Sequence, residues 1–174
     1  MQRASLRKLR KTVETLWART GLDGRADIFD ARRDDGSAHV EIVAGRYDIV
    51  VTERGQETER IAGLSLEEAA GWFLFGMASA HGQAAELKGR QAPRDAPPLP
   101  CGLVDDGYSR WNWMAPTIAI LNRISAEHGE MALRDYREVL SRHPLSADEI
   151  RNARYPLLPG IEAAEGMKPA PDAS

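Results

Sequence analysis

The sequence predicts an α+β fold in which an antiparallel β-meander packs on one long central helix, with further helices, in a single domain. Three observations support this prediction. Apolar residues recur with a period of two between residues 26 and 62, and then with a helical period from 65 to 90. The segments between the expected strands are too short for crossover connections, so the strands must form hairpins. We assign residues 1–157 to this domain and expect 158–174 to form a flexible tail, because little there could pack.

The composition is that of an ordinary globular protein. The chain has 174 residues, of which 43% are hydrophobic and 28% charged, and its formal net charge is -3. This charge disfavours general nucleic-acid binding and suits a basic partner. Cys101 is the single cysteine, which excludes an internal disulfide. No apolar run reaches the ~20 residues that span a bilayer. We therefore expect a soluble, cytoplasmic protein that does not enter the membrane.

The first element is a helix over residues 4–20, which Gly21 ends. The face of this helix that lies opposite its apolar stripe is basic, whereas the whole chain is mildly acidic. That face is either an arm for nucleic acid or anionic lipid, or the solvated side of a packed helix, and we favour the second interpretation. The apolar stripe consists of Leu6, Leu9, Val13, Leu16 and Trp17.

The meander follows over residues 26–62. A first strand starts at Ala26 and ends at a turn signal over residues 34–37. Short turns at residues 44–46 and 54–56 then separate three alternating segments, and one face of the sheet should pack on the central helix.

The central helix spans residues 65–90. Ser65 and Glu68 form a capping box at its start. Glu86 belongs to the expected polar face, and the glycines at 71, 76 and 82 suggest that another element lies close to the helix backbone. The expected buried stripe is Leu66, Ala70, Phe73, Met77, Ala80, Ala84 and Leu87.

A Pro-rich loop over residues 91–110 leads to the C-terminal helices at 116–155. Pro116 is expected in the first turn of the first helix, and Ser125 caps a second helix that runs to about Arg142. Ser146 and Glu149 form another capping box, for a short helix that ends near residue 155. The expected core positions are Ile118, Leu121, Ile124, Ala132, Tyr136, Val139 and Leu140.

The sequence contains no catalytic or metal-binding motif that we recognise. The four histidines lack ligand spacing, no Gly-rich loop joins a strand to a helix, and no serine lies in a nucleophile elbow. An enzyme would have to use Asp105, Asp106 or the carboxylates of the meander, which are more typical of solvated cross-strand neighbours. We expect no catalysis and no cofactor.

The segment from Tyr108 to Trp113 combines a tyrosine, an arginine and two tryptophans. These residue types dominate the hot spots of protein interfaces. Alternatively, Trp111 and Trp113 anchor the end of the Pro-rich loop to the core. Both interpretations remain open, with one ring inside and one outside as a third.

Three sequence blocks, taken in order, resemble the immunity protein 63 family of bacterial polymorphic toxin systems. The resemblance covers roughly residues 45–145. It implies an α+β protein that stays in the cytoplasm of the producing cell and neutralises one cognate toxin domain by binding it, without chemistry of its own. The blocks are Glu53-Arg54-Gly55-Gln56-Glu57 with Glu59-Arg60; Glu86-Leu87-Lys88 with Arg90; and residues 121–124 with 138–144.

The expected contact residues come from the bottom-up interpretation. Aromatic and cationic anchors would bind the toxin, and acidic residues of the meander would add charge if the toxin is basic. The alternative is a regulatory or nucleic-acid-linked module that uses the basic residues 3–11. The oligomeric state remains open. The candidate contact residues are Tyr108, Arg110, Trp111, Trp113, Glu57 and Glu59.

Overall fold

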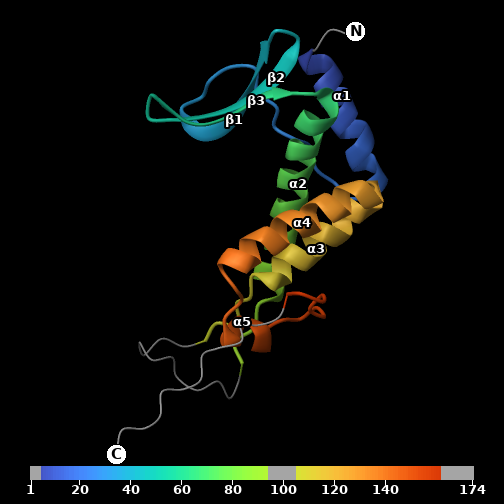
Figure 1. Ribbon diagram of the computed structural model, residues 1–174, viewed down its shortest axis with the longest axis vertical. Coiled ribbons are helices and arrows are strands. Elements are labelled where there is room, and N and C mark those ends of the chain that lie inside the picture. Colours follow the sequence, from blue (N-terminus) through green and yellow to red (C-terminus); the bar gives the residue numbers. More distant parts are fainter. Residues whose placement is uncertain (1–4, 94–104, 162–174) are drawn as a thin grey trace, which may run out of the picture. The chain divides into compact units, whose positions relative to one another are not determined.

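A computed structural model describes residues 5–93 and 105–161 (Figure 1). Among them are a three-stranded antiparallel sheet and five α-helices, and the long helix α2 packs against the sheet, which confirms the predicted single α+β domain. The elements are α1 (Leu6–Trp17), the 3-10 turn η1 (Ala18–Thr20), β1 (Asp35–Val43), β2 (Arg46–Glu53), β3 (Gln56–Leu64), α2 (Leu66–Gly89), α3 (Trp111–Ile124), α4 (Ala126–Arg142) and α5 (Ala147–Arg151).

The chain divides into two compact units. Unit 1 comprises Met1–Ala78 and Ile120–Gly129, and therefore holds the sheet and α1. Unit 2 comprises Ser79–Ala119 and Glu130–Ser174, and holds α5.

The predicted N-terminal helix is confirmed. The Ser5 hydroxyl accepts a hydrogen bond from the Lys8 amide at 3.2 Å and so caps α1. Leu9, Val13 and Trp17 are buried, and Gly21 ends the helix in the left-handed conformation with φ 68°. The apolar stripe therefore faces the core of unit 1.

The sheet has the strand order β1-β2-β3 and is a meander of two hairpins. Each hairpin closes with two residues of positive φ, Ala44-Gly45 (50° and 78°) and Arg54-Gly55 (51° and 83°). This pair of conformations is the type I′ turn, whose twist matches that of the flanking strands. The two turns predicted from the sequence are thus confirmed.

The strand predicted from Ala26 is wrong. Phe29 forms only an isolated parallel bridge with His39, and the sheet begins at Asp35. The backbone carbonyls of the segment have other partners, since the Arg10 guanidinium donates to the Ile28 oxygen at 2.6 Å and the Val40 amide donates to the Phe29 oxygen at 2.9 Å. A helix side chain therefore takes a hydrogen bond that a fourth strand would have needed.

Helix α2 begins with the predicted capping box, in which Ser65 and Glu68 exchange hydrogen bonds of 2.8 and 3.2 Å. Its buried stripe matches the prediction at Ala70 and Phe73 but not beyond Met77. There Ala78, Gly82 and Glu86 are buried, whereas Ala80, Ala84 and Leu87 are exposed.

Close approach to α3 explains which face of this half of α2 is buried. A Cβ atom on Gly82 would lie 2.5 Å from the Trp113 carbonyl oxygen and 2.6 Å from the Thr117 hydroxyl. Only glycine permits this contact. Gly76 has no atom within 4 Å of such a position, so the expected close approach holds at Gly82 and not at Gly76.

Helix α3 begins at Trp111, five residues before the predicted start, and Pro116 lies inside it. The Ser109 and Arg110 carbonyls accept from the amides of Asn112 and Met114, which closes the first turn upstream of the proline. The predicted core positions in α3, Ile118, Leu121 and Ile124, are buried.

In α4 the predicted Ser125 cap is present, and its hydroxyl accepts from the His128 amide at 3.3 Å. Ala132, Tyr136 and Leu140 are buried as expected, but Val139 is 43% exposed because it lies beside the stripe that the other three define. The capping box of α5 is confirmed, although this helix ends at Arg151.

The predicted tail does not begin at 158. Ile161 is only 3% exposed, and the Arg137 guanidinium donates to the Pro159 carbonyl at 3.2 Å. Residues 162–174 lie outside the described residues, as do residues 94–104 of the Pro-rich loop, with Cys101. In the part of the chain that the structure describes, no helix has both the length and the apolar character needed to cross a membrane.

Candidate partner-binding site

Arg110 has a structural role in unit 2. Its guanidinium donates to both carboxylate oxygens of Glu149, at 2.6 and 2.8 Å, and to the carbonyls of His143 and Pro144 at 2.9 and 2.7 Å. These bonds join the start of α3 to the segment before α5. The Arg110 guanidinium therefore donates its hydrogen bonds within unit 2 and not to a partner.

Glu149 is held ionised by this arrangement. Burial by itself raises the pKa of the Glu149 carboxyl, but hydrogen bonds from Arg110 and from the backbone amides of Ser146 and Arg110 outweigh it. The pKa falls from 4.5 to about 2.

Trp111 belongs to the core. Its side chain is 1% exposed, and its indole nitrogen donates to the Pro156 carbonyl at 3.1 Å. A partner cannot reach a ring buried to this extent in this structure. The loop-anchor interpretation therefore describes Trp111.

Tyr108 and Trp113 lie together with Arg90, and we name these three residues the aromatic surface. Trp113 donates from its indole nitrogen to the Tyr108 hydroxyl at 3.3 Å, and its ring meets Tyr136 edge-on, with centroids 5.6 Å apart. The Arg90 guanidinium carbon lies 4.8 Å from the Tyr108 ring centroid, a cation–π arrangement. Tyr108 is 37% exposed, and Trp113 is half-buried.

The cation of the aromatic surface is fixed by two carboxylates. Arg90 donates to both oxygens of Glu86, at 3.0 and 2.8 Å, and to Asp106 at 2.8 Å. Glu86 hydrogen bonding is the main cause that raises the pKa of Arg90 above its ordinary value. Arg90 was not among the contact residues predicted from the sequence, although its four-residue spacing from Glu86 is the signal of a helical ion pair.

A rigid turn sets the position of Tyr108. The Asp105 carboxylate accepts from the Gly107 amide at 2.9 Å and from Arg151 and Asn152, at 2.6 and 2.9 Å. The Gly107 amide is the first cause that lowers the pKa of Asp105, followed by Arg151. Gly107 has φ 80°, and a Cβ atom there would collide with the Gln91 carbonyl. The Asp105 carboxylate, considered from the sequence as a possible acid–base group, therefore holds this turn together.

Glu57 and Glu59, the two acidic contact candidates of the meander, lie on opposite faces of the sheet. The register pairs Glu57 with Thr52 and Glu59 with Val51, and a β-bulge lies between these pairs. Since Thr52 and Val51 are consecutive in β2, their side chains point to opposite faces, and so do those of Glu57 and Glu59. The two carboxylates therefore cannot act as one site on one face of the sheet.

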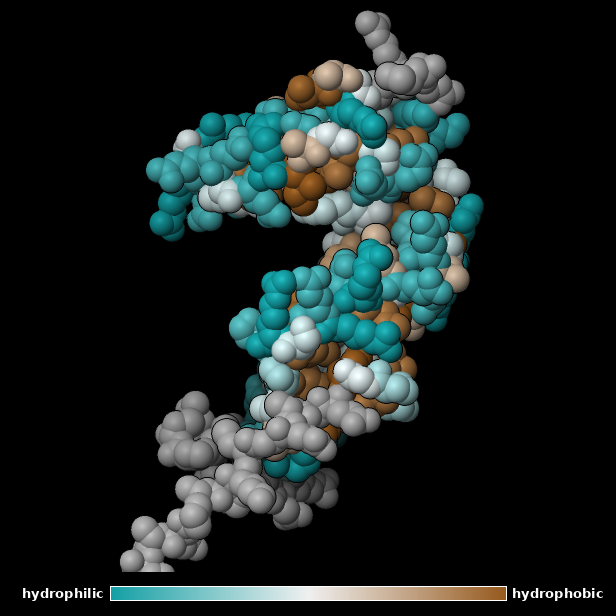
Figure 2. Space-filling model, viewed as in Figure 1, coloured by the Kyte–Doolittle hydropathy of each residue, from teal (hydrophilic) through white to brown (hydrophobic). Residues whose placement is uncertain are grey.

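Glu57 joins a charged cluster centred on Arg60, which comprises Arg60, Glu41, Asp48 and Glu57. Arg60 donates to both oxygens of Glu57 at 2.8 Å, and to Glu41 and Asp48 at 2.9 Å. Hydrophilic side chains cover most of the sheet in the view of Figure 2. Arg60 engages all three carboxylates, but one guanidinium against three carboxylates leaves the cluster with a net negative charge.

The basic face of α1 also has partners within unit 1. Arg10 binds the Ile28 carbonyl, and Arg19 donates to the Ile124 carbonyl at 3.3 Å. Of the cations in residues 3–11 on which the nucleic-acid alternative depends, Arg10 is thus engaged. This arrangement favours the interpretation of a packed, solvated helix.

Within residues 5–93 and 105–161, no group of three or more histidine, cysteine or acidic side chains is arranged to hold a metal ion. Comparison of the chain with protein-family models, curated proteins and solved structures finds no significant match.

Proposed function

We propose that this chain is an immunity protein that binds and neutralises a cognate bacterial toxin domain in the cytoplasm of the producing cell. The proposal rests on the resemblance over residues 45–145 and on one structural observation. That observation is the aromatic surface, whose tyrosine, tryptophan and arginine are residue types that anchor protein interfaces, namely Tyr108, Trp113 and Arg90.

Preorganisation is what makes the aromatic surface suited to tight binding. Ordering a side chain on association costs about 0.5–1.5 kcal/mol per residue. The Tyr108 hydroxyl, the Trp113 indole and the Arg90 guanidinium already have hydrogen-bond partners in the free chain. Much of that ordering cost is therefore met on folding, and the exposed ring area remains available to a partner.

Glu59 is an accessory contact in this proposal. It is exposed and lies on the face of the sheet opposite to the Arg60 cluster. A basic toxin domain could use it without competing with Arg60.

Co-expression tests the proposal. The variable C-terminal domain of a large secreted protein encoded next to this chain would be produced in bacteria with and without it. We expect the toxin domain alone to arrest growth, and the chain to restore growth and to co-purify with the domain. If growth is not restored by the wild-type chain, the immunity proposal is wrong.

Variants then test the surface. Tyr108→Ala and Trp113→Ala should each weaken binding by about 30-fold, the effect of losing a hot spot of about 2 kcal/mol. Tyr155→Ala is the matched control, because Tyr155 is an equally exposed tyrosine of unit 2, at 40%. If wild-type and both aromatic variants bind equally, the toxin contacts another surface. Circular dichroism of each variant separates lost binding from lost folding.

A further inference from the structure

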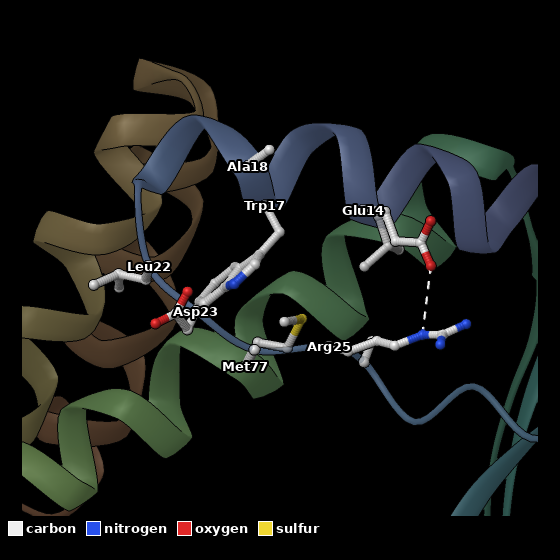
Figure 3. Close-up of a pocket in the computed structure, with 10 residues that line it drawn as sticks. Glu14, Trp17, Ala18, Leu22, Asp23, Arg25 and Met77 are labelled. Atoms are coloured by element: carbon white, nitrogen blue, oxygen red, sulfur yellow. Dashed lines mark ion pairs between the residues drawn. The ribbon is translucent and has the colours of Figure 1, made fainter.

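Unit 1 contains a pocket of about 220 Å³ between α1, the segment that follows it and α2 (Figure 3). Trp17, the largest side chain that lines this pocket, is only 3% exposed. At the rim, Arg25 Nε lies 3.5 Å from Glu14 Oε1, the ion pair that Figure 3 marks with a dashed line. The Trp17 indole therefore belongs to the core of unit 1. Apolar area that a partner can reach lies on unit 2.

Leu87, in the last turn of α2, is 68% exposed, the largest exposed fraction among the large apolar side chains of the described residues. The Arg90 amide donates to the Leu87 carbonyl at 3.4 Å, so Arg90 continues the helical turn that contains Leu87. Side chains three positions apart are neighbours on a helix surface. Leu87 therefore lies beside Arg90, whose guanidinium stacks on the Tyr108 ring.

Leu87 thus enlarges the aromatic surface. The donors of the Arg90 guanidinium are taken by Glu86 and Asp106, so the centre of the enlarged area offers a partner an aliphatic side chain and an aromatic ring. An apolar centre surrounded by polar groups that already have partners is typical of an interface hot spot, and an apolar side chain of the partner fits it. We name this area the Leu87 surface, and it comprises Leu87, Arg90, Tyr108 and Trp113.

The accessible charge at the rim of the Leu87 surface is negative. The Asp106 side chain is 60% exposed, whereas those of Arg90 and Glu86 are 28% and 3% exposed. Asp106 accepts from the Arg90 guanidinium and from the Tyr108 amide, at 2.8 and 3.0 Å, and a carboxylate has about four acceptor sites. A cation of the partner can therefore bind Asp106 without displacing Arg90.

Two further cations near the end of α2 lie around the helix from this rim. Lys88 is two positions before Arg90, and Arg154 lies against Gly89, two positions after Leu87. Residues two positions apart do not face each other on a helix. Neither cation therefore shares the side of α2 that carries both Leu87 and Arg90.

We propose that the Leu87 surface binds the cognate toxin domain, which places an apolar side chain between Leu87 and Tyr108 and a lysine or arginine beside Asp106. The identity of the partner rests on the proposed function, and the Leu87 surface specifies the chemistry of the partner's contact segment. A second copy of this chain fits less well, because a two-fold interface on the same surface brings two Asp106 carboxylates together.

Calorimetric titration of the full chain with the variable C-terminal domain encoded next to it tests the apolar part of the surface. Leu87→Ala should bind at least about tenfold more weakly, because most of the apolar side chain that binding buries is lost. Leu87→Met keeps the volume and should bind within about threefold of wild type. Ile42→Ala, which truncates an exposed apolar side chain of unit 1 (43%), is the control and should bind as wild type. The melting temperatures should not change, since both positions are exposed.

Association kinetics measured by stopped flow test the rim. Asp106→Asn keeps an oxygen for the Tyr108 amide and removes the charge. This variant should associate with the toxin domain about threefold more slowly than wild type at about 50 mM NaCl, and the two rates should converge at about 500 mM NaCl, where charges are screened. Asp135→Asn, which changes an exposed carboxylate of α4 that lies 3.8 Å from Arg134, is the matched control and should associate as wild type.

Equal affinity of Leu87→Ala and wild type overturns the proposal, and so does association of Asp106→Asn at the wild-type rate or faster. Sedimentation of the chain alone as a dimer that Leu87→Ala dissociates also overturns it, since the surface then serves a second copy. If the wild-type chain restores growth and Leu87→Ala binds the domain equally well, the immunity function stands and only the Leu87 surface is wrong. If the wild-type chain neither binds the domain nor restores growth, both proposals are wrong.

Discussion

Arg110 and Glu149 lie 39 positions apart in the chain and are joined by two hydrogen bonds between guanidinium and carboxylate, at 2.6 and 2.8 Å. Glu149 also accepts the Ser146 amide of its own capping box. One carboxylate therefore starts α5 and fixes the residue that precedes α3.

This pair makes the free energy of unfolding depend on pH. The pKa of Glu149 is about 2 in the folded chain and ordinarily 4.5, so the unfolded chain binds the proton first as pH falls. The stabilisation is complete above pH 4.5 and disappears as pH falls through about 2. It amounts to about 3 kcal/mol, an order-of-magnitude value from the difference in pKa.

Urea unfolding between pH 7 and pH 3 measures this effect. Glu149→Gln should be less stable than wild type at pH 7, and the difference should shrink towards pH 3. Glu138→Gln, which removes an exposed partner of Arg142, is the control and should follow wild type. A difference that does not vary with pH would show that the Glu149 charge contributes nothing.

Trp111→Ala should destabilise the protein by about 3–5 kcal/mol, because it leaves a cavity where a large aromatic side chain was buried. Trp111→Phe should cost less, since it mainly removes the hydrogen bond to Pro156. Thermal unfolding of both variants provides the measurement. An unchanged melting temperature for Trp111→Ala would place the ring outside the core.

Two glycines of α2 should respond in opposite ways to alanine. Gly76→Ala should stabilise the protein by about 0.5–1 kcal/mol, because alanine has the higher helix propensity and the position is open. Gly82→Ala should destabilise it, since the new methyl group meets the Trp113 carbonyl. The denaturant midpoints of the two variants, compared with that of wild type, measure these changes in stability. Stabilisation by Gly82→Ala would mean that α3 does not approach α2 at this point.

Ala44→Asn should stabilise the first hairpin. Ala44 has φ 50° in a type I′ turn, a conformation that asparagine adopts more readily than alanine. An alanine in the left-handed region costs roughly 1–2 kcal/mol, so relieving part of that strain should raise the unfolding free energy by up to about 1 kcal/mol. The variant Arg46→Asn, in the adjoining strand, is the control, and its unfolding free energy should not exceed that of wild type.

The local rules were sufficient for the hairpins, for the capping serines Ser65, Ser125 and Ser146, and for the helical stripe of α1. They failed where tertiary contacts decide. Spacing alone placed Leu87 inside and Glu86 outside, whereas the burial is reversed, because Arg90 pairs with the Glu86 carboxylate and α3 approaches α2 at Gly82. The fourth strand was predicted because nothing in the local sequence shows that Arg10 takes the Ile28 carbonyl.

The candidate site was predictable in composition but not in geometry. The segment from Tyr108 to Trp113 is identifiable by its residue types. If the helix had been predicted to start at Trp111, Trp111 and Tyr108 would have been expected to point in different directions. Which ring is inside depends on Pro156, which lies 45 positions away from Trp111. Likewise, a strand period of two places Glu57 and Glu59 on one face, and only the bulge in the β2–β3 register separates them.

The same bulge has a consequence for how copies of the protein meet at high concentration. In the described sheet, β3 pairs with β2 alone. The outer edge of β3 is therefore open to pairing with a strand of another molecule. A strand arriving there would have to reproduce the extra residue, and it would meet a glutamate on each face of the sheet. The irregularity that divides the two carboxylates therefore also protects the protein from edge-to-edge aggregation.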